Sequence, residues 1–150
     1  MSDIKIFSFF SGSGFLDLGF EMNGFDVDFV NEFSPAFMNA YVYARKKMNL
    51  RKPKYGYFNT DINIYLDENS SELLEYISDA RRDGNLVGFI GGPPCPDFSI
   101  AGKNRGCDGD NGKLSQSYVD AIIKIKPDFF LFENVKDYGK QQDIENFLRH

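Results

Sequence analysis

The chain has few residues that could form disulfide bonds or bind a metal ion. Among its 150 residues are two cysteines, Cys95 and Cys107, and one histidine, His150. Two cysteines cannot build a dense disulfide framework, and one histidine cannot complete a typical cysteine–histidine zinc site. No apolar run approaches the roughly 18 residues of a membrane span, and no basic segment leads into an apolar stretch at the N-terminus. The sequence therefore predicts a protein of the reducing cytoplasm without a membrane segment.

The sequence also lacks an excess of basic residues. It contains 17 Lys and Arg against 22 Asp and Glu, which gives a net charge of −5. A protein that binds nucleic acid usually has a basic surface, and this balance alone argues against one. If a nucleic acid is the substrate, most of the positive surface must be local or must lie outside this chain. The hydrophobic content of 42% and aromatic content of 16% are those of a globular domain.

Short apolar runs alternate along the chain with amphipathic stretches. This alternation predicts a parallel, doubly wound α/β sheet in a single domain, residues 1–150. The expected strands are 4–10, 27–30, 57–59, 86–90 and 129–132. The expected helices are 15–23, 34–48 with Ser34 as N-cap, 72–82 and 115–126, with a glycine-rich loop over 96–113. In the first helix, Phe15, Leu18 and Met22 share one apolar face.

Residues suited to binding or catalysis follow each predicted strand. Ligands of doubly wound sheets bind outside the carboxyl ends of the strands, so we expect one site at this edge. In strand order, these residues are Gly12 and Gly14, Glu32, Asp61, Cys95 and Glu133.

The turn over 12–14 and Glu32 together favour a nucleoside cofactor. Glycines between strand and helix let the backbone approach a ligand, and Glu32, 20 residues after Gly12, could accept hydrogen bonds from both ribose hydroxyls. The dinucleotide fingerprint needs glycine at the position of Asp17, whose carboxylate would repel a pyrophosphate. S-adenosylmethionine therefore fits better than NAD, and a tight turn without a ligand is the alternative. Asp61 could accept from an adenine amino group or could cap a helix.

Cys95 and Glu133 are the candidate reactive groups. Cys95 follows two glycines and two prolines at a strand end, where a thiolate could act as a nucleophile; a buried structural cysteine is the alternative. Glu133 follows an apolar strand, where partial burial would raise its pKa and suit it to proton transfer. A salt-bridge partner or a helix N-terminal acid is the alternative. With His150 at the terminus, a Cys–His dyad is not expected.

Three segments resemble successive motifs of the cytosine-C5 DNA methyltransferase family. They are Phe-Ser-Gly-Ser-Gly at 10–14, Gly-Gly-Pro-Pro-Cys-Pro-Asp-Phe-Ser at 91–99, and Glu-Asn-Val at 133–135. Their order and spacing match over nearly the whole chain. The resemblance implies a Rossmann-like fold, S-adenosylmethionine as cofactor, and methylation of a cytosine flipped out of DNA, as in restriction–modification systems.

The resemblance also implies roles for individual residues. Cys95 would attack C6 of the cytosine, Glu133 would hold its N3 and N4 edge, and Asn134 would fix Glu133. The implied cofactor-binding residues are Phe10, Ser11, Gly12, Ser13, Gly14, Phe15, Glu32, Phe33, Asp61, Ile62, Pro94 and Leu114. Ser99, Lys103 and Arg105 would face DNA from a lid over 96–112.

Some features depart from the family pattern. Phe15, Pro96 and Asn111 stand where the family usually has glycine, glutamine and arginine. Family members also continue for well over a hundred residues, with a target-recognition domain that this chain does not contain. We therefore expect the catalytic half of a methyltransferase with a sheet incomplete at the C-terminus: a fragment, a remnant, or a subunit that needs a second polypeptide. RNA (tRNA) methylation and a non-catalytic cofactor-binding or interaction module are the alternatives, and an NAD oxidoreductase is a distant one.

Overall fold

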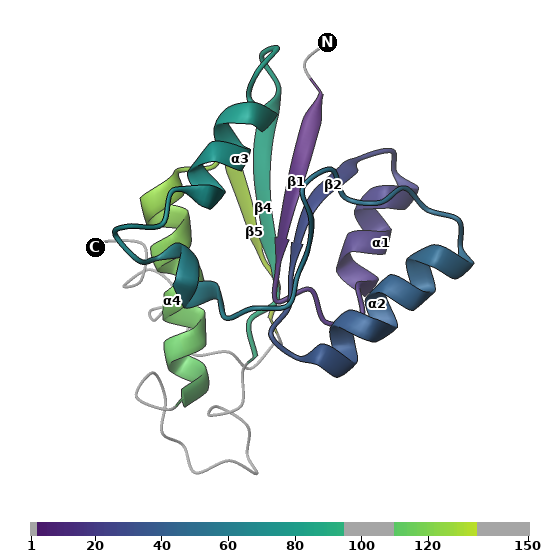
Figure 1. Cartoon of the computed structure of the whole chain (residues 1–150), viewed down its shortest axis with the longest axis horizontal. Coiled ribbons are helices and arrows are strands. Elements are labelled where there is room, and N and C mark those ends of the chain that lie inside the picture. The colour runs from purple at the N-terminus through teal and green to yellow at the C-terminus, as the bar shows by residue number, and fades with distance from the viewer. Residues whose placement is uncertain (1–2, 95–109, 135–150) are drawn as a thin grey trace.

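Five short apolar segments form one parallel sheet in the order β3-β2-β1-β4-β5 (Figure 1). The computed structural model describes residues 3–94 and 110–134, and these five segments are the strands of that part of the chain. The strands are β1 (Ile4–Phe9), β2 (Asp26–Asn31), β3 (Gly56–Phe58), β4 (Leu86–Gly91) and β5 (Phe129–Phe132). Because every pairing is parallel, the carboxyl ends of the strands meet at one edge, the lower edge in Figure 1.

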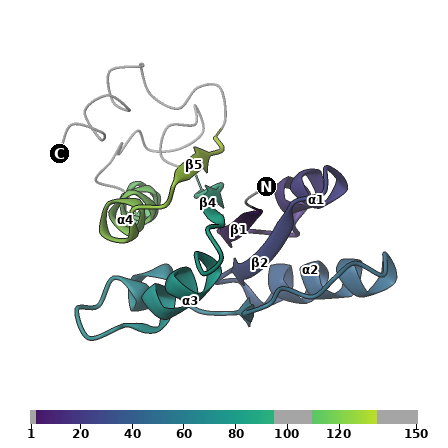
Figure 2. The same cartoon turned by 90° about the horizontal axis from the view of Figure 1, so that it is seen from above.

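Helices cover both faces of this sheet. The helices are α1 (Phe15–Met22), α2 (Pro35–Lys47), α3 (Glu72–Ala80) and α4 (Asp110–Ile125), with a 3₁₀ helix, η1 (Ile62–Tyr65), after β3. Figure 2 shows α1 and α2 on one face and α3 and α4 on the other. The predicted doubly wound α/β sheet is therefore confirmed. Within the described part of the chain, no helix has the length and apolar character to cross a membrane.

The two faces of the sheet have separate apolar cores, because successive side chains of a strand point to opposite faces. The core under α3 and α4 is mainly aromatic. The ring centroids of the stacked pair Phe7 and Phe29 lie 5.3 Å apart, and those of Phe9 and Phe89 lie 4.8 Å apart. The core under α1 and α2 is mainly aliphatic, with Ile6 as a buried member. Each core therefore packs its own pair of helices against the sheet.

The predicted ends of the elements are correct to within three residues except at α4. This helix begins at Asp110, five residues before the predicted start, so the loop predicted over 96–113 is wrong for residues 110–113. Glycines such as Gly112 suggested a loop, but an interior glycine costs a helix only about 1 kcal/mol and does not prevent one. The 3₁₀ helix η1 was not predicted.

The predicted buried face of α1 is wrong. Phe15 and Met22 are 83% and 77% exposed, whereas Leu16 and Phe20 pack on the aliphatic core and Asp17 is fully buried. The helix carries apolar residues on two sides, so periodicity alone could not identify the side that faces the sheet.

Candidate functional site

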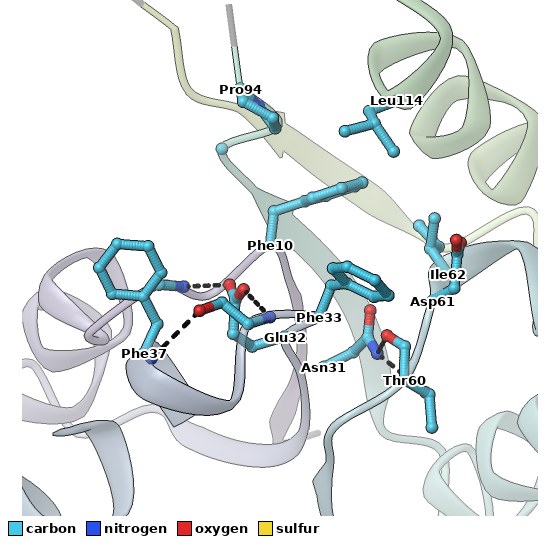
Figure 3. Close-up of a pocket in the computed structure, with 13 residues that line it drawn as sticks. Phe10, Asn31, Glu32, Phe33, Phe37, Thr60, Asp61, Ile62, Pro94 and Leu114 are labelled. Atoms are coloured by element: carbon cyan, nitrogen blue, oxygen red, sulfur yellow. Dashed lines mark hydrogen bonds between the residues drawn. The ribbon is translucent and has the colours of Figure 1, made fainter. Parts of the chain in front are cut away.

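A cavity of about 350 Å³ lies at the carboxyl edge, between the ends of the first four strands and the start of α4 (Figure 3). Its volume is within the range of small-molecule and cofactor sites. It is lined by Phe10, Gly12, Asn31, Glu32, Phe33, Ser34, Phe37, Thr60, Asp61, Ile62, Gly92, Pro94 and Leu114.

The turn after β1 forms one side of the cavity through unusual backbone conformations. Phe10, Gly12 and Gly14 have φ values of 50°, 54° and 85°. Positive φ is uncommon for a residue with a β-carbon such as Phe10, and strained residues of this kind concentrate at ligand sites. Gly12 presents its N–H group to the cavity acid, Glu32, at 2.8 Å.

Backbone groups hold both carboxylate oxygens of Glu32. Oε2 accepts from Gly12 N–H at 2.8 Å, and Oε1 accepts from Ser34 N–H at 2.7 Å. Ser34 is the predicted N-cap of α2, and its hydroxyl accepts from Phe37 N–H. Glu32 is 9% exposed and therefore has a fixed orientation. Each carboxylate oxygen has a further lone pair, which a hydroxyl group of a ligand could use.

The opposite wall is built where β2 and β3 end. The Asn31 amide donates to the carbonyl of Thr60 at 2.9 Å. Asp61 Oδ1 accepts from the backbone and side-chain nitrogens of Asn63, both at 2.8 Å. Asp61 therefore caps η1, which is the alternative role that the sequence suggested for it. Ser117 of α4 donates to Asn63 Oδ1 at 2.8 Å, which ties α4 to this wall.

Apolar side chains line much of the remaining surface. Phe10, Phe33, Ile62 and Leu114 border the same space in Figure 3, with Pro94 at its rim. A cavity with apolar walls and one oriented carboxylate can bind a flat ring system joined to a group with hydroxyls. A nucleoside has both parts.

The structure brings together eight of the twelve predicted cofactor-binding residues as cavity lining: Phe10, Gly12, Glu32, Phe33, Asp61, Ile62, Pro94 and Leu114. Ser11, Ser13 and Gly14 belong to the same turn without lining the cavity, and Phe15 points away from the protein at the start of α1.

Five lining residues were missed from the sequence: Asn31, Ser34, Phe37, Thr60 and Gly92. Asn31, Ser34, Thr60 and Gly92 lie at or shortly after a strand end, which was the available signal. Phe37 lies in the first turn of α2, where that signal does not apply.

Glu133 lies beside the cavity. Its N–H donates to the Gly91 carbonyl at 2.8 Å, and a β-carbon added to the lining residue Gly92 would lie 2.9 Å from Glu133 Oε2. The expected partial burial is wrong, because Glu133 is exposed. It follows β5, an edge strand that pairs only with β4 among the described strands. Asn134 is half-buried.

The remaining predicted site residues, Cys95, Ser99, Lys103 and Arg105, lie outside the described residues. Cys95 directly follows the cavity residue Pro94 in the chain.

The expected effect of Asp17 on a ligand also needs correction. Its carboxylate is fully buried and accepts from the hydroxyls of Ser8 and Tyr41, both at 2.8 Å. It does not line the cavity, so its carboxylate would not contact a phosphate bound there. The dinucleotide fingerprint still lacks its third glycine at this position. The residue that replaces it is buried in the protein and is not directed at a ligand.

Comparison with known proteins identifies the family. The model of the C-5 cytosine-specific DNA methylase family matches residues 4–149. The chain belongs to this family. It is 63% identical over 148 residues to the type II methyltransferase M.NmeDI of Neisseria meningitidis serogroup C, a match that covers 96% of this chain and 35% of the relative. It is 37% identical over 142 residues to M.FnuDI of Fusobacterium nucleatum, covering 95% and 35%.

These curated relatives are longer, and the chain spans about a third of their length. A solved structure has the same fold: a prophage-encoded protein of E. coli, described as a candidate DNA modification methyltransferase, matches with a TM-score of 0.66 at 24% identity. This match covers 96% of the chain and 36% of that protein.

Proposed function

We propose that this chain is the cofactor-binding and catalytic portion of a methyltransferase that transfers a methyl group from S-adenosylmethionine to C5 of cytosine in DNA. The observation that carries the proposal is the cavity containing Glu32, with Glu133 at its edge and Cys95 next in sequence to its rim. Membership of the family supplies the reaction class.

The residues of the cavity fit the proposed cofactor. Glu32, oriented by two backbone N–H groups, would accept hydrogen bonds from the ribose hydroxyls. Phe33 and Ile62 would pack on the adenine ring, and Asp61, whose Oδ1 is used by Asn63, would meet the ring edge with Oδ2. The turn over 10–15 would hold the methionine part. S-adenosylmethionine supplies an electrophilic methyl group when bound.

The reactive groups of the chain would activate cytosine for this methyl group. The Cys95 thiolate would form a bond to C6 of the flipped base, which makes C5 nucleophilic. Glu133 would hydrogen bond N3 and N4, so that negative charge does not accumulate on the ring, and Asn134 would position Glu133. Once C5 carries the methyl group, its proton leaves to a base, the bond to Cys95 Sγ breaks, and the double bond between C5 and C6 returns.

We propose DNA as the substrate in preference to RNA, because the matched family model describes a DNA methylase and the relatives are named type II methyltransferases. Ser99, Lys103 and Arg105 would contact the DNA. The net charge of −5 supports a target-recognition part outside residues 1–150, supplied by a longer chain or by a second polypeptide. Such an enzyme would act in the cytoplasm.

The test is covalent trapping on DNA that contains 5-fluorocytosine. Fluorine at C5 cannot leave as a proton does, so the adduct to Cys95 would persist after methyl transfer. The chain is assayed alone and with the part of M.NmeDI beyond the matched region, supplied as a second polypeptide. We expect a denaturation-resistant complex that requires S-adenosylmethionine.

Two cysteine variants make the trapping assay specific. Cys95→Ser should abolish the complex, whereas Cys107→Ser, the matched control, should leave it intact. A complex that survives Cys95→Ser would overturn the proposed nucleophile. Binding of S-adenosylmethionine without any transfer, with or without the second polypeptide, would instead favour a non-catalytic module.

A further inference from the structure

A buried polar network lies next to the turn over 11–14, and none of its side chains lines the cavity. Asp17 of α1 accepts hydrogen bonds from Ser8 of β1 and Tyr41 of α2, both at 2.8 Å. Asp17 and Tyr41 are fully buried. Burying a carboxylate is unfavourable unless hydrogen bonds replace its hydration, so these bonds fix the relative positions of β1, α1 and α2.

Arg45 makes a second connection between α2 and the turn. It lies four residues after Tyr41, on the same face of α2, and is 3% exposed. Its Nη2 donates to the Gly14 carbonyl at 2.7 Å and pairs with Glu21 at 2.8 Å. Its guanidinium carbon lies 4.0 Å from the centre of the Tyr41 ring. Arg45 therefore holds the last residue of the turn directly.

Gly14 leaves no space between the turn and these two side chains. A β-carbon there would lie 2.5 Å from the Tyr41 ring and 2.6 Å from Arg45 Nη1, and the φ of 85° also disfavours any other residue. Tyr41 and Arg45 thus form the surface against which the turn is packed.

The turn carries this constraint to the cavity. Gly14 N–H donates to the Ser11 carbonyl at 2.9 Å, and Gly12 N–H donates to Glu32 at 2.8 Å. The second oxygen of Glu32 accepts from Ser34, where α2 begins. Helix α2 therefore contacts the cavity acid at its first turn and the glycine turn through its buried face.

We propose that Asp17, Tyr41 and Arg45 are positioning residues that set the Gly12 N–H group and the Glu32 carboxylate for the cofactor. The inference rests on the proposed function, in which that cofactor is S-adenosylmethionine. The three side chains act through the backbone of the turn and through α2, because they do not reach the cavity themselves.

Tyr41→Phe is the sharpest test, because it keeps the ring against Gly14 and removes only the hydroxyl. Tyr55→Phe is the matched control: it removes a tyrosine hydroxyl that donates to Asp79 at 2.7 Å, next to the aromatic core on the opposite face of the sheet. Both variants of the 150-residue chain are compared with wild type by titration calorimetry with S-adenosylmethionine. The amide signals of Gly12 and Gly14 are compared by ¹H–¹⁵N NMR without ligand.

We expect Tyr41→Phe to raise the Kd about tenfold, which corresponds to about 1.4 kcal/mol, and to shift both glycine signals. Tyr55→Phe should change neither. If Tyr41→Phe does not fold, Arg45→Lys provides the same test, since it retains the charge and loses the planar donor at the Gly14 carbonyl.

A folded Tyr41→Phe chain with wild-type affinity and unmoved glycine signals would overturn the inference and leave the network a purely structural role. If wild type does not bind S-adenosylmethionine, either alone or with the second polypeptide, the proposed cofactor is wrong. The glycine signals then decide the positioning role by themselves, because they need no ligand: a shift supports it, and unmoved signals overturn it.

Discussion

Replacing Asp17 by asparagine should change how the stability of the protein depends on pH. Burial, with a smaller contribution from the charge of Glu21, raises the pKa of Asp17 from its ordinary value of 3.8 to about 6. Hydrogen bonds from Tyr41 and Ser8 and the charge of Arg45 oppose this rise only in part. Burial also raises the pKa of Tyr41 far above its usual range, so its hydroxyl remains a donor throughout.

The sign follows from proton binding in the two states. Between pH 3.8 and about 6, Asp17 is protonated in the native protein and ionised in the unfolded chain. The native state binds more protons there, so the free energy of unfolding falls as pH rises through this interval and is level above it. The difference between the two pKa values corresponds to a total loss of about 3 kcal/mol in the free energy of unfolding as pH rises. About 2 kcal/mol of this loss occurs between about pH 4.5 and 7.

Urea denaturation of wild type and Asp17→Asn at several pH values across this window measures the effect. The chain has no tryptophan, so far-UV circular dichroism is the suitable signal. Relative to the variant, wild type should lose about 2 kcal/mol between about pH 4.5 and 7. A constant difference between the two curves would refute the reasoning, because it would mean that the native protein stabilises the ionised carboxylate as well as water does.

Asp26→Asn is the control for this experiment. A hydrogen bond from Lys5 lowers the pKa of Asp26, assisted by the charge of Arg51. A carboxyl with a lowered pKa contributes stability that is lost only as pH falls through that pKa, below the window of measurement. The Asp26→Asn and wild-type curves should therefore run parallel above about pH 4.5.

Two further predictions concern the cavity and the sheet. Glu32→Gln replaces one carboxylate oxygen by an amide nitrogen, which cannot accept a hydrogen bond from Gly12 or Ser34. It should weaken S-adenosylmethionine binding, measured by calorimetry, about tenfold. An unchanged Kd would show that Glu32 does not belong to the cofactor site. Gly88→Ala would force a β-carbon into the Phe129 ring and should lower the free energy of unfolding by about 2 kcal/mol. Gly19→Ala, where a β-carbon meets open space on α1, should raise the free energy of unfolding by up to about 1 kcal/mol. If urea denaturation gave the same change for Gly88→Ala and Gly19→Ala, this prediction would be contradicted.

Local signals in the sequence were sufficient to predict that a cavity lies at the carboxyl edge of the sheet. Apolar runs bounded by glycine or proline located the strands, and the residues after them had to meet at one edge once the sheet was parallel. Glu32 was identified in this way, and it lines the cavity with Gly12. The exposure of Glu133 was not foreseen, because it depends on β5 being an edge strand of the described sheet, which the strand sequence alone does not reveal.

Asp17 illustrates what local signals cannot provide. A charged residue on a helix is expected to face either a ligand or the solvent, yet Asp17 is fully buried. Its partners, Ser8 and Tyr41, come from positions 9 residues before and 24 residues after it. Only the folded chain brings these hydroxyls together, and only their hydrogen bonds make the buried position of a carboxylate tolerable. The buried faces of α1 and α2 are therefore decided jointly, and the turn that borders the cavity inherits its geometry from that pairing.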